Sequence, residues 1–214
     1  EGISQVFTVT GGGAMHLNDS LGHHPGLSCL YHHHEQAAAM AAEAYARVDN
    51  RMAAVCVTSG PGATNAITGA LCAWMDSIPM LVLSGQVRYD TTVRHSGLKI
   101  RTMGVQEYDI TPSVEPMTKY AVMVTDPLTI RYHLERAIYL AKTGRPGPCW
   151  LDLPLNVQSA VVETDDLKAY DPSEDAKELP APVSDETVKQ ILEKLKLASQ
   201  PLIFAGHGIR LAGA

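Results

Sequence analysis

Six short apolar runs alternate with helix-forming segments, and this alternation constrains the fold more than any other feature of the sequence. The runs are residues 6–10, 28–31, 52–58, 80–84, 121–124 and 149–153. They are almost continuously apolar, as expected for strands that are covered on both faces of a parallel sheet. Helical patterns lie between them, at residues 14–21, 35–48, 63–75 and 126–142. This order predicts a doubly wound α/β fold, with a mostly parallel six-stranded sheet and helices on both of its faces.

The composition of the chain changes after the last predicted strand. Residues 161–183 are rich in acidic and small residues and contain three prolines, which is typical of a linker. A capped helix is predicted after Ser184, and residues 201–206 have the pattern of a further strand. We therefore expect a first domain over residues 1–160, a linker over 161–183, and the truncated start of a second α/β domain over 184–214.

Composition and charge restrict the partners of the chain. Of its 214 residues 45% are hydrophobic, and the net charge is −6, so neither a disordered chain nor a basic nucleic-acid-binding surface is expected. No apolar run approaches the roughly 18 residues of a membrane span, and no signal peptide is visible. The four cysteines form no Cys-x-x-Cys pair and have apolar neighbours, as reduced cysteines do. We expect a cytoplasmic protein.

Two glycine-rich turns, at residues 11–13 and 60–62, follow predicted strands and lead into helices. Glycine lets a ligand approach the backbone, and a helix N-terminus offers free N–H groups. The same turns also occur where no ligand binds. Neither turn contains the lysine of a P-loop or the third glycine of the Gly-x-Gly-x-x-Gly pattern. A non-catalytic nucleotide-binding or scaffolding module stays an alternative, although the sequence contains neither of these two nucleotide-binding signatures.

Glu35 stands where the second predicted strand ends and an alanine-rich helix begins. An acidic residue in the first turn of a helix interacts favourably with the helix dipole, and this role alone can explain its position. Three histidines, at residues 32–34, precede it. Adjacent strand residues point to opposite faces, so we expect no metal site there. The alanines permit close packing against another helix, in the same chain or in a second copy.

Seven segments, taken in order, resemble the N-terminal, pyrimidine-binding domain of thiamine-diphosphate-dependent enzymes. Within that family the resemblance is closest to the acetolactate synthase group. It covers residues 3–158 without a large gap, and the residues from about 184 resemble the start of the family's central domain. The seven segments are residues 11–13, 34–47, 58–65, 76–79, 85–87, 106–107 and 144–148.

The resemblance implies roles for individual residues of the first domain. Glu35 matches the glutamate that hydrogen-bonds a ring nitrogen of the cofactor's aminopyrimidine and so promotes ylid formation. A carboxyl group in a dry pocket can share a proton with such a heterocycle near neutral pH. Pro61 and Asn65 would line the pyrimidine pocket, while Gly12 and Gly13 would pass close to the cofactor or substrate.

The resemblance also implies a reaction, partners and cofactors. Gln106 matches a family glutamine near the substrate, which would be a 2-keto acid undergoing carboligation or decarboxylation. The family binds the diphosphate and Mg²⁺ through a Gly-Asp-Gly motif in its C-terminal domain, and this chain contains none. We therefore expect half a site here, in a homodimer or homotetramer formed through this domain.

Two residues depart from the pattern of biosynthetic acetolactate synthases. Leu155 stands where those enzymes carry a lysine, and Val105 stands where an aromatic residue usually precedes the glutamine. A thiamine-diphosphate-dependent decarboxylase or lyase acting on another 2-keto or acyl substrate therefore stays open, as does the use of a flavin.

Overall fold

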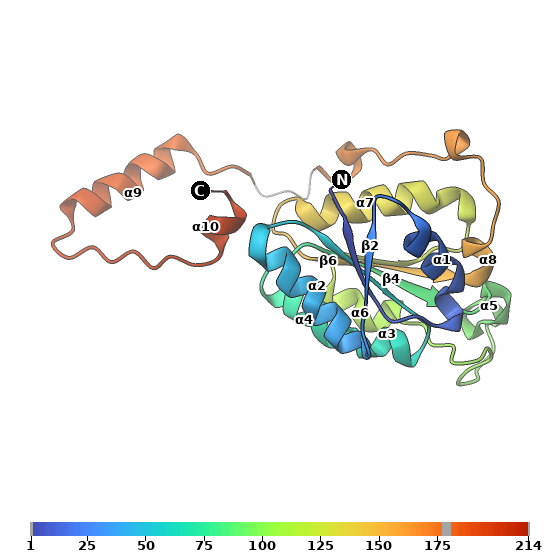
Figure 1. Cartoon of the computed structure of the whole chain (residues 1–214). Coiled ribbons are helices and arrows are strands. Elements are labelled where there is room, and N and C mark those ends of the chain that lie inside the picture. The colour runs from blue at the N-terminus through green and yellow to red at the C-terminus, as the bar shows by residue number, and fades with distance from the viewer. Residues whose placement is uncertain (1, 177–180, 214) are drawn as a thin grey trace. The chain divides into compact units, whose positions relative to one another are not determined.

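The computed structural model describes residues 2–176 and 181–213. The chain forms two compact units, one up to Pro172 and one from Ser173 onward. In the first unit six parallel strands form one sheet in the order β2-β1-β3-β4-β6-β5 (Figure 1). The predicted six-stranded, doubly wound α/β fold is confirmed. The strands are β1 (Gln5–Thr8), β2 (Ser28–Tyr31), β3 (Ala53–Val57), β4 (Met80–Gln86), β5 (Tyr120–Met123) and β6 (Pro148–Pro154).

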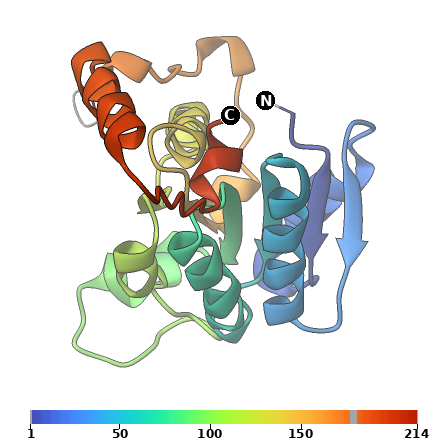
Figure 2. The same ribbon diagram turned by 90° about the vertical axis from the view of Figure 1, so that its left-hand side faces the viewer.

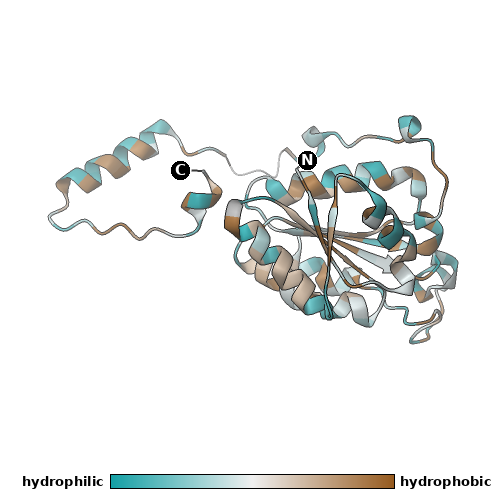
Figure 3. Ribbon diagram, in the orientation of Figure 1, coloured by the Kyte–Doolittle hydropathy of each residue, from teal (hydrophilic) through white to brown (hydrophobic). Residues whose placement is uncertain are grey.

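Helices cover both faces of this sheet. Those that pack on one face are α2 (Glu35–Asp49), α4 (Ile67–Met75) and α6 (Thr111–Val114). Those that pack on the other are α1 (Met15–His23), α7 (Ile130–Lys142) and α8 (Leu155–Gln158). Two further short helices, α3 (Pro61–Asn65) and α5 (Val93–Ser96), follow β3 and β4. Figure 3 shows apolar strands between the helices, with polar residues frequent on α7 and mostly apolar residues on α4.

Alternation along the central strands builds the two apolar layers. In β3, Val55 and Val57 face the layer beneath α2 and α4, whereas Ala54 and Cys56 face the layer beneath α1. Every residue of β3 and β4 is buried. A strand with both faces covered must be apolar on both, which explains why these runs read as continuous in the sequence.

Helices α2 and α4 pack side by side, as Figure 2 shows. A Cβ atom placed on Gly69 of α4 would lie 2.5 Å from the Cβ atom of Ala39 on α2, so the two helices approach as closely as glycine and alanine allow. Arg47 of α2 forms ion pairs with Glu43 and with Asp76, which follows α4. The alanines predicted to permit close helix packing therefore do so within the chain.

The helix predicted over residues 63–75 is two helices in the structure. The N–H of Ala66 bonds the carbonyl of Ala63 at 3.1 Å, which tightens the chain and ends α3 before α4 begins. The prediction of one continuous helix was wrong because alanine and threonine are compatible with either arrangement, and local propensity is a weak guide to a break.

The second unit contains α9 (Asp185–Leu197) and α10 (Gly208–Leu211). The side chain of Ser184 accepts a hydrogen bond from the N–H of Thr187 at 3.2 Å, so the predicted cap is confirmed. The strand predicted over residues 201–206 is wrong, because this segment has no regular secondary structure. A strand needs a hydrogen-bonded neighbour, and none is found for it in the described part of this unit.

The boundaries predicted at residues 160 and 183 stay predictions. Residues 161–172 belong to the first unit by their contacts, with Leu167 and Tyr170 buried. The N–H of Tyr170 donates to the carboxylate of Glu135 on α7 at 2.8 Å. No helix in the described ranges is long and apolar enough to cross a membrane.

Candidate functional site

The order of the strands reverses at β1, and this reversal selects one edge of the sheet. The chain goes from β1 to β2 on one side and then crosses to β3 on the other side. Open α/β sheets bind ligands at the carboxyl ends of the strands on either side of such a reversal. Both predicted glycine turns lie at this edge, residues 11–13 after β1 and residues 60–62 after β3.

The first glycine turn is held by close backbone contacts. The N–H of Gly13 donates to the hydroxyl of Thr58 at 3.0 Å, and the Nε2 atom of Gln158 donates to the carbonyl of Gly13 at 2.8 Å. A Cβ atom on Gly11 would lie 2.5 Å from the Cβ of Thr58, and one on Gly85 would lie 2.1 Å from the Gly13 carbonyl oxygen. Glycine is required here because the backbone segments meet with no space for a side chain.

Glu35 is the first residue of α2 and stands beside the second glycine turn. His34 caps the helix, because its Nδ1 atom accepts the N–H of Gln36 at 3.1 Å. The side chain of Glu35 is half-buried, and its Oε2 atom accepts a hydrogen bond from Nδ2 of Asn65 at 2.9 Å. Its Oε1 atom would lie 3.4 Å from a Cβ atom on Gly62.

The Glu35 carboxylate therefore has one oxygen fixed by Asn65 and one oxygen on the side of the glycine turn. Among the residues that the structure describes, no hydrogen bond to Oε1 of Glu35 is found. Such a carboxylate can hydrogen-bond a heterocyclic nitrogen and exchange a proton with it. Glycine is required at residue 62, because a Cβ atom there would lie 2.6 Å from Cγ2 of Thr58.

The other residues predicted for the site are exposed at the same edge of the sheet. Pro61 is exposed at the first position of α3. Gly12 is exposed, and a Cβ atom there would meet nothing within 4 Å. Gln106 is exposed as well, and its carbonyl oxygen would lie 2.2 Å from a Cβ on Gly60. The structure thus brings the two turns and Gln106 together, while the roles predicted for these residues stay predictions.

The three histidines before α2 have separate surroundings. The ring of His32 packs on Phe7, with ring centroids 5.8 Å apart, and His34 caps α2. In the described ranges, no three His, Cys, Asp or Glu side chains are arranged to hold a metal ion.

Sequence reasoning missed a buried polar network beneath this edge, centred on Asp152 of β6. Asp152 is fully buried and accepts hydrogen bonds from the Ser84 hydroxyl at 2.6 Å and from Nε2 of Gln86 at 3.1 Å. The Trp150 indole donates to the Ser84 hydroxyl at 2.8 Å. Burial raises the pKa of Asp152 to about 7, although the hydrogen bonds from Ser84 and Gln86 act in the opposite direction. The signal in the sequence was an aspartate inside an apolar run, since a buried carboxyl group requires partners.

Comparison with known proteins gives this edge a chemical context. Residues 1–107 match the family described as thiamine pyrophosphate enzyme, N-terminal TPP binding domain. The acetolactate synthase large subunit of Lactococcus lactis is 37% identical over the whole of this chain, which covers 35% of that protein. The large subunit of Corynebacterium glutamicum is 38% identical over 98% of this chain and 32% of its own length. Acetolactate synthase isozyme 3 large subunit of Escherichia coli is 34% identical over the whole chain and 36% of its own length. The chain thus spans about a third of the length of these curated relatives.

The raised pKa of Asp152 predicts a pH dependence of stability. An aspartate has a pKa of about 3.9 when unfolded, so between about pH 4 and pH 7 the folded chain retains a proton that the unfolded chain has lost. The contribution of Asp152 to stability therefore falls as the pH rises through this window. In Asp152→Asn this decline is absent. The free energy of unfolding of the variant, relative to that of the original chain, should rise between pH 4 and pH 7, by about 1.4 kcal/mol for each unit of pKa shift.

Urea denaturation at several pH values measures this difference, with Asp165→Asn on the exposed surface as the matched control. A difference between Asp152→Asn and the original chain that stays constant from pH 4 to pH 7 would show that Asp152 is ionised throughout.

Proposed function

Because the chain belongs to the thiamine pyrophosphate enzymes, as their N-terminal cofactor-binding domain, we propose that it supplies the pyrimidine-binding half of an active site that acts on 2-keto acids. The full enzyme would be an acetolactate-synthase-like carboligase or decarboxylase. The observation that carries the proposal is the Glu35–Asn65 pair, which stands at the edge of the sheet where the strand order reverses. The homology of the chain to acetolactate synthase large subunits supports the same reaction class.

The residues at this edge fit an aminopyrimidine ring. We expect Oε1 of Glu35 to meet a ring nitrogen, because Asn65 holds Oε2 and so fixes the plane of the carboxylate. The glycine turns bring backbone groups to this edge without side chains of their own, and Pro61 offers an apolar ring at the start of α3. When bound, thiamine diphosphate supplies the carbanion chemistry of the reaction. The protein supplies orientation and a proton exchange at Oε1 of Glu35.

The diphosphate and Mg²⁺ would be held by another part of the full protein. The sequence contains no Gly-Asp-Gly, and in the described part of the chain no acidic or histidine cluster could bind the metal. A site divided between this domain and a second one supports an assembly in which the domain faces another copy or another domain.

We propose that this assembly is a homodimer or homotetramer that buries the outer face of α2 and α4. Several apolar side chains are exposed on these two adjacent helices: Met40, Val48, Leu71, Trp74 and Met75. Exposed apolar side chains gathered on neighbouring helices are typical of an interaction surface.

The four cysteines are all free, which supports a reducing compartment, and we propose the cytoplasm. Cell fractionation tests this location.

A decarboxylase or lyase that acts on a different 2-keto or acyl substrate is a second candidate. Leu155 and Val105 favour it, because they replace the lysine and the aromatic residue of the biosynthetic pattern. Val105 is 84% exposed, so its side chain is free to meet a substrate. Product analysis with a series of 2-keto acids distinguishes the candidates, since a carboligase forms a carbon–carbon bond and a decarboxylase releases an aldehyde.

The role of Glu35 predicts a specific loss in Glu35→Gln. Glutamine retains the shape of the side chain and can still meet Asn65, but it cannot exchange a proton with a ring nitrogen. In the full protein with thiamine diphosphate and Mg²⁺ bound, exchange of the thiazolium C2 proton should slow by about 10²-fold or more, the usual contribution of a positioned acid–base group. Quenched-flow exchange read by proton NMR measures this rate, and circular dichroism checks that the fold is retained.

The exposed Glu163→Gln is the matched control and should exchange at the original rate. If Glu35→Gln exchanged at that rate too while binding the cofactor normally, Glu35 would have no part in proton exchange.

The proposed interface predicts self-association through α2 and α4. Sedimentation of the full protein at tens of micromolar (roughly the concentration at which a weak interface forms) should show at least a dimer. Leu71→Glu introduces a charge on α4 and should shift the protein toward the monomer, whereas Leu128→Glu, which is exposed next to α7, should not. A monomeric full protein, or equal behaviour of the two variants, would contradict this interface.

A further inference from the structure

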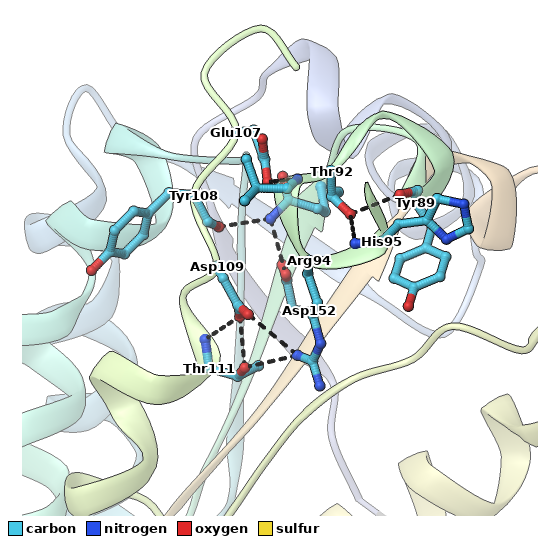
Figure 4. A network of polar contacts seen from close by, with 11 residues as sticks. Tyr89, Thr92, Arg94, His95, Glu107, Tyr108, Asp109, Thr111 and Asp152 are labelled. Atoms are coloured by element: carbon cyan, nitrogen blue, oxygen red, sulfur yellow. Dashed lines mark hydrogen bonds and ion pairs between the residues drawn. The ribbon is translucent and has the colours of Figure 1, made fainter. Parts of the chain in front are cut away.

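We propose that Glu107 is a positioning residue that holds the turn carrying Gln106 against the glycine turn of the site. The inference deepens the proposed function, because it assigns a role to a carboxylate that does not itself face the cofactor edge. It rests on a loop, residues 104–109, in which Glu107, Tyr108 and Asp109 are each bound to a different neighbouring segment. Figure 4 shows Glu107, Tyr108 and Asp109 following one another along this loop.

The conformation of Gln106 is the first observation. Gln106 has a φ of +57°, and residues other than glycine and asparagine seldom adopt this left-handed backbone conformation. It is the third residue of a four-residue turn, closed by a hydrogen bond of 3.2 Å from the N–H of Glu107 to the carbonyl of Gly104. Strained backbone persists where surrounding contacts determine it, and it concentrates at functional sites. The strain at Gln106 therefore requires contacts that hold the turn.

The Glu107 carboxylate provides those contacts. Its Oε2 atom accepts the N–H groups of Met103 at 2.8 Å and of Gly104 at 3.3 Å, at the start of the turn. Its Oε1 atom accepts the N–H of Val93 at 2.7 Å, at the first residue of α5. One side chain thus joins the turn to the segment that follows β4. Only a group with two acceptor oxygens at this reach can satisfy donors on both sides.

The neighbouring residues of the loop are also bound. The carbonyl of Tyr108 accepts a hydrogen bond of 2.8 Å from Nε2 of Gln86, the same atom that donates to the buried Asp152. The carboxylate of Asp109 accepts from the hydroxyl of Thr111 at 2.7 Å and pairs with Arg94 at 3.4 Å. The base of the loop is therefore fixed to β4 and α6, and Glu107 fixes its tip.

The turn that Glu107 holds contacts the second glycine turn of the site. Gly60, with a φ of +57°, stands so close to Gln106 that a Cβ on it would lie 2.2 Å from the Gln106 carbonyl oxygen. Gly60 precedes α3, which carries Asn65, the partner of Glu35. Gln106 is therefore held beside the turn that leads into α3, whose Asn65 bonds the Glu35 carboxylate. Release of Glu107 would move Gln106 while leaving Glu35 and Asn65 in place.

The test compares Glu107→Ala and Glu107→Gln in the full protein with thiamine diphosphate and Mg²⁺. Glutamine has one acceptor oxygen and can satisfy one of the two sides, so it should give an intermediate effect. The first readout is amide hydrogen exchange at Val93, Met103 and Gly104. Exchange should accelerate by about tenfold or more in Glu107→Ala, as expected when bonds to a charged acceptor are lost. Glu115 is exposed, so Glu115→Gln is the matched control and should leave amide exchange at these three residues unchanged.

The second readout is kinetic and separates a positioning role from a merely structural one. With a 2-keto acid substrate, kcat/KM should fall by about tenfold or more in Glu107→Ala, while thiazolium C2 exchange stays within about twofold of the original rate. A loss confined to the substrate step assigns the defect to the turn that carries Gln106 and not to the carboxylate of Glu35. Glu107→Gln should recover part of the loss.

Three results would overturn the proposal: unchanged exchange at Val93, Met103 and Gly104 in Glu107→Ala, an unchanged kcat/KM despite faster amide exchange, or C2 exchange that slows in step with kcat/KM. Failure of the proposed function is distinguishable from these. A full protein that turns over no 2-keto acid contradicts the function, and the amide exchange rates then decide by themselves whether Glu107 holds the turn.

Discussion

The site depends on one constraint, which is the close approach of backbone segments at the carboxyl ends of β1, β3 and β4. The carbonyl of Gly13 lies against Gly85 with no space for a Cβ atom, and its N–H is bound by Thr58. Because Gly11, Gly13 and Gly85 leave no room for a side chain of their own, the segments after β1, β3 and β4 meet at one edge. Glu35 and Asn65 reach that edge from the helices that follow β2 and β3. A side chain at residue 85 would collide with Gly13 and displace the turn at residues 11–13.

Two carboxylates near this edge show how the same chemical group serves different purposes. Asp152 is enclosed by β4 and β6 and meets two side-chain donors, so burial dominates and raises its pKa. Glu107 is half-buried and meets three backbone N–H groups, which fix the loop that contains Gln106. Gln86 connects the two, since its amide donates both to Asp152 and to the Tyr108 carbonyl. The polar network beneath the sheet edge is thus continuous with the loop above it.

Much of the fold could be predicted from the sequence, because parallel strands covered on both faces are largely apolar, with Asp152 of β6 as a buried exception. The six runs, the two glycine turns and the position of Glu35 at a strand–helix junction all follow from local patterns. The family resemblance then joined Glu35, Asn65 and Gln106 into one site. The break between α3 and α4 was not predictable, since it depends on one tight hydrogen bond at Ala66. The segment 201–206 has a strand-like pattern but no strand beside it. The contacts of Glu107 join residues up to 14 positions apart along irregular chain, and no periodicity reports on such contacts.

The central claim is that Glu35 meets the pyrimidine ring through the oxygen that Asn65 leaves available. The most direct measurement is a crystal structure of the full protein with thiamine diphosphate and Mg²⁺. The account predicts Oε1 of Glu35 within about 2.6–3.2 Å of a ring nitrogen of the aminopyrimidine. It also predicts that Asn65 stays on Oε2 and that the ring lies against the turns at residues 11–13 and 60–62. A cofactor bound elsewhere in the fold, or a ring nitrogen that contacts neither oxygen of Glu35, would contradict it.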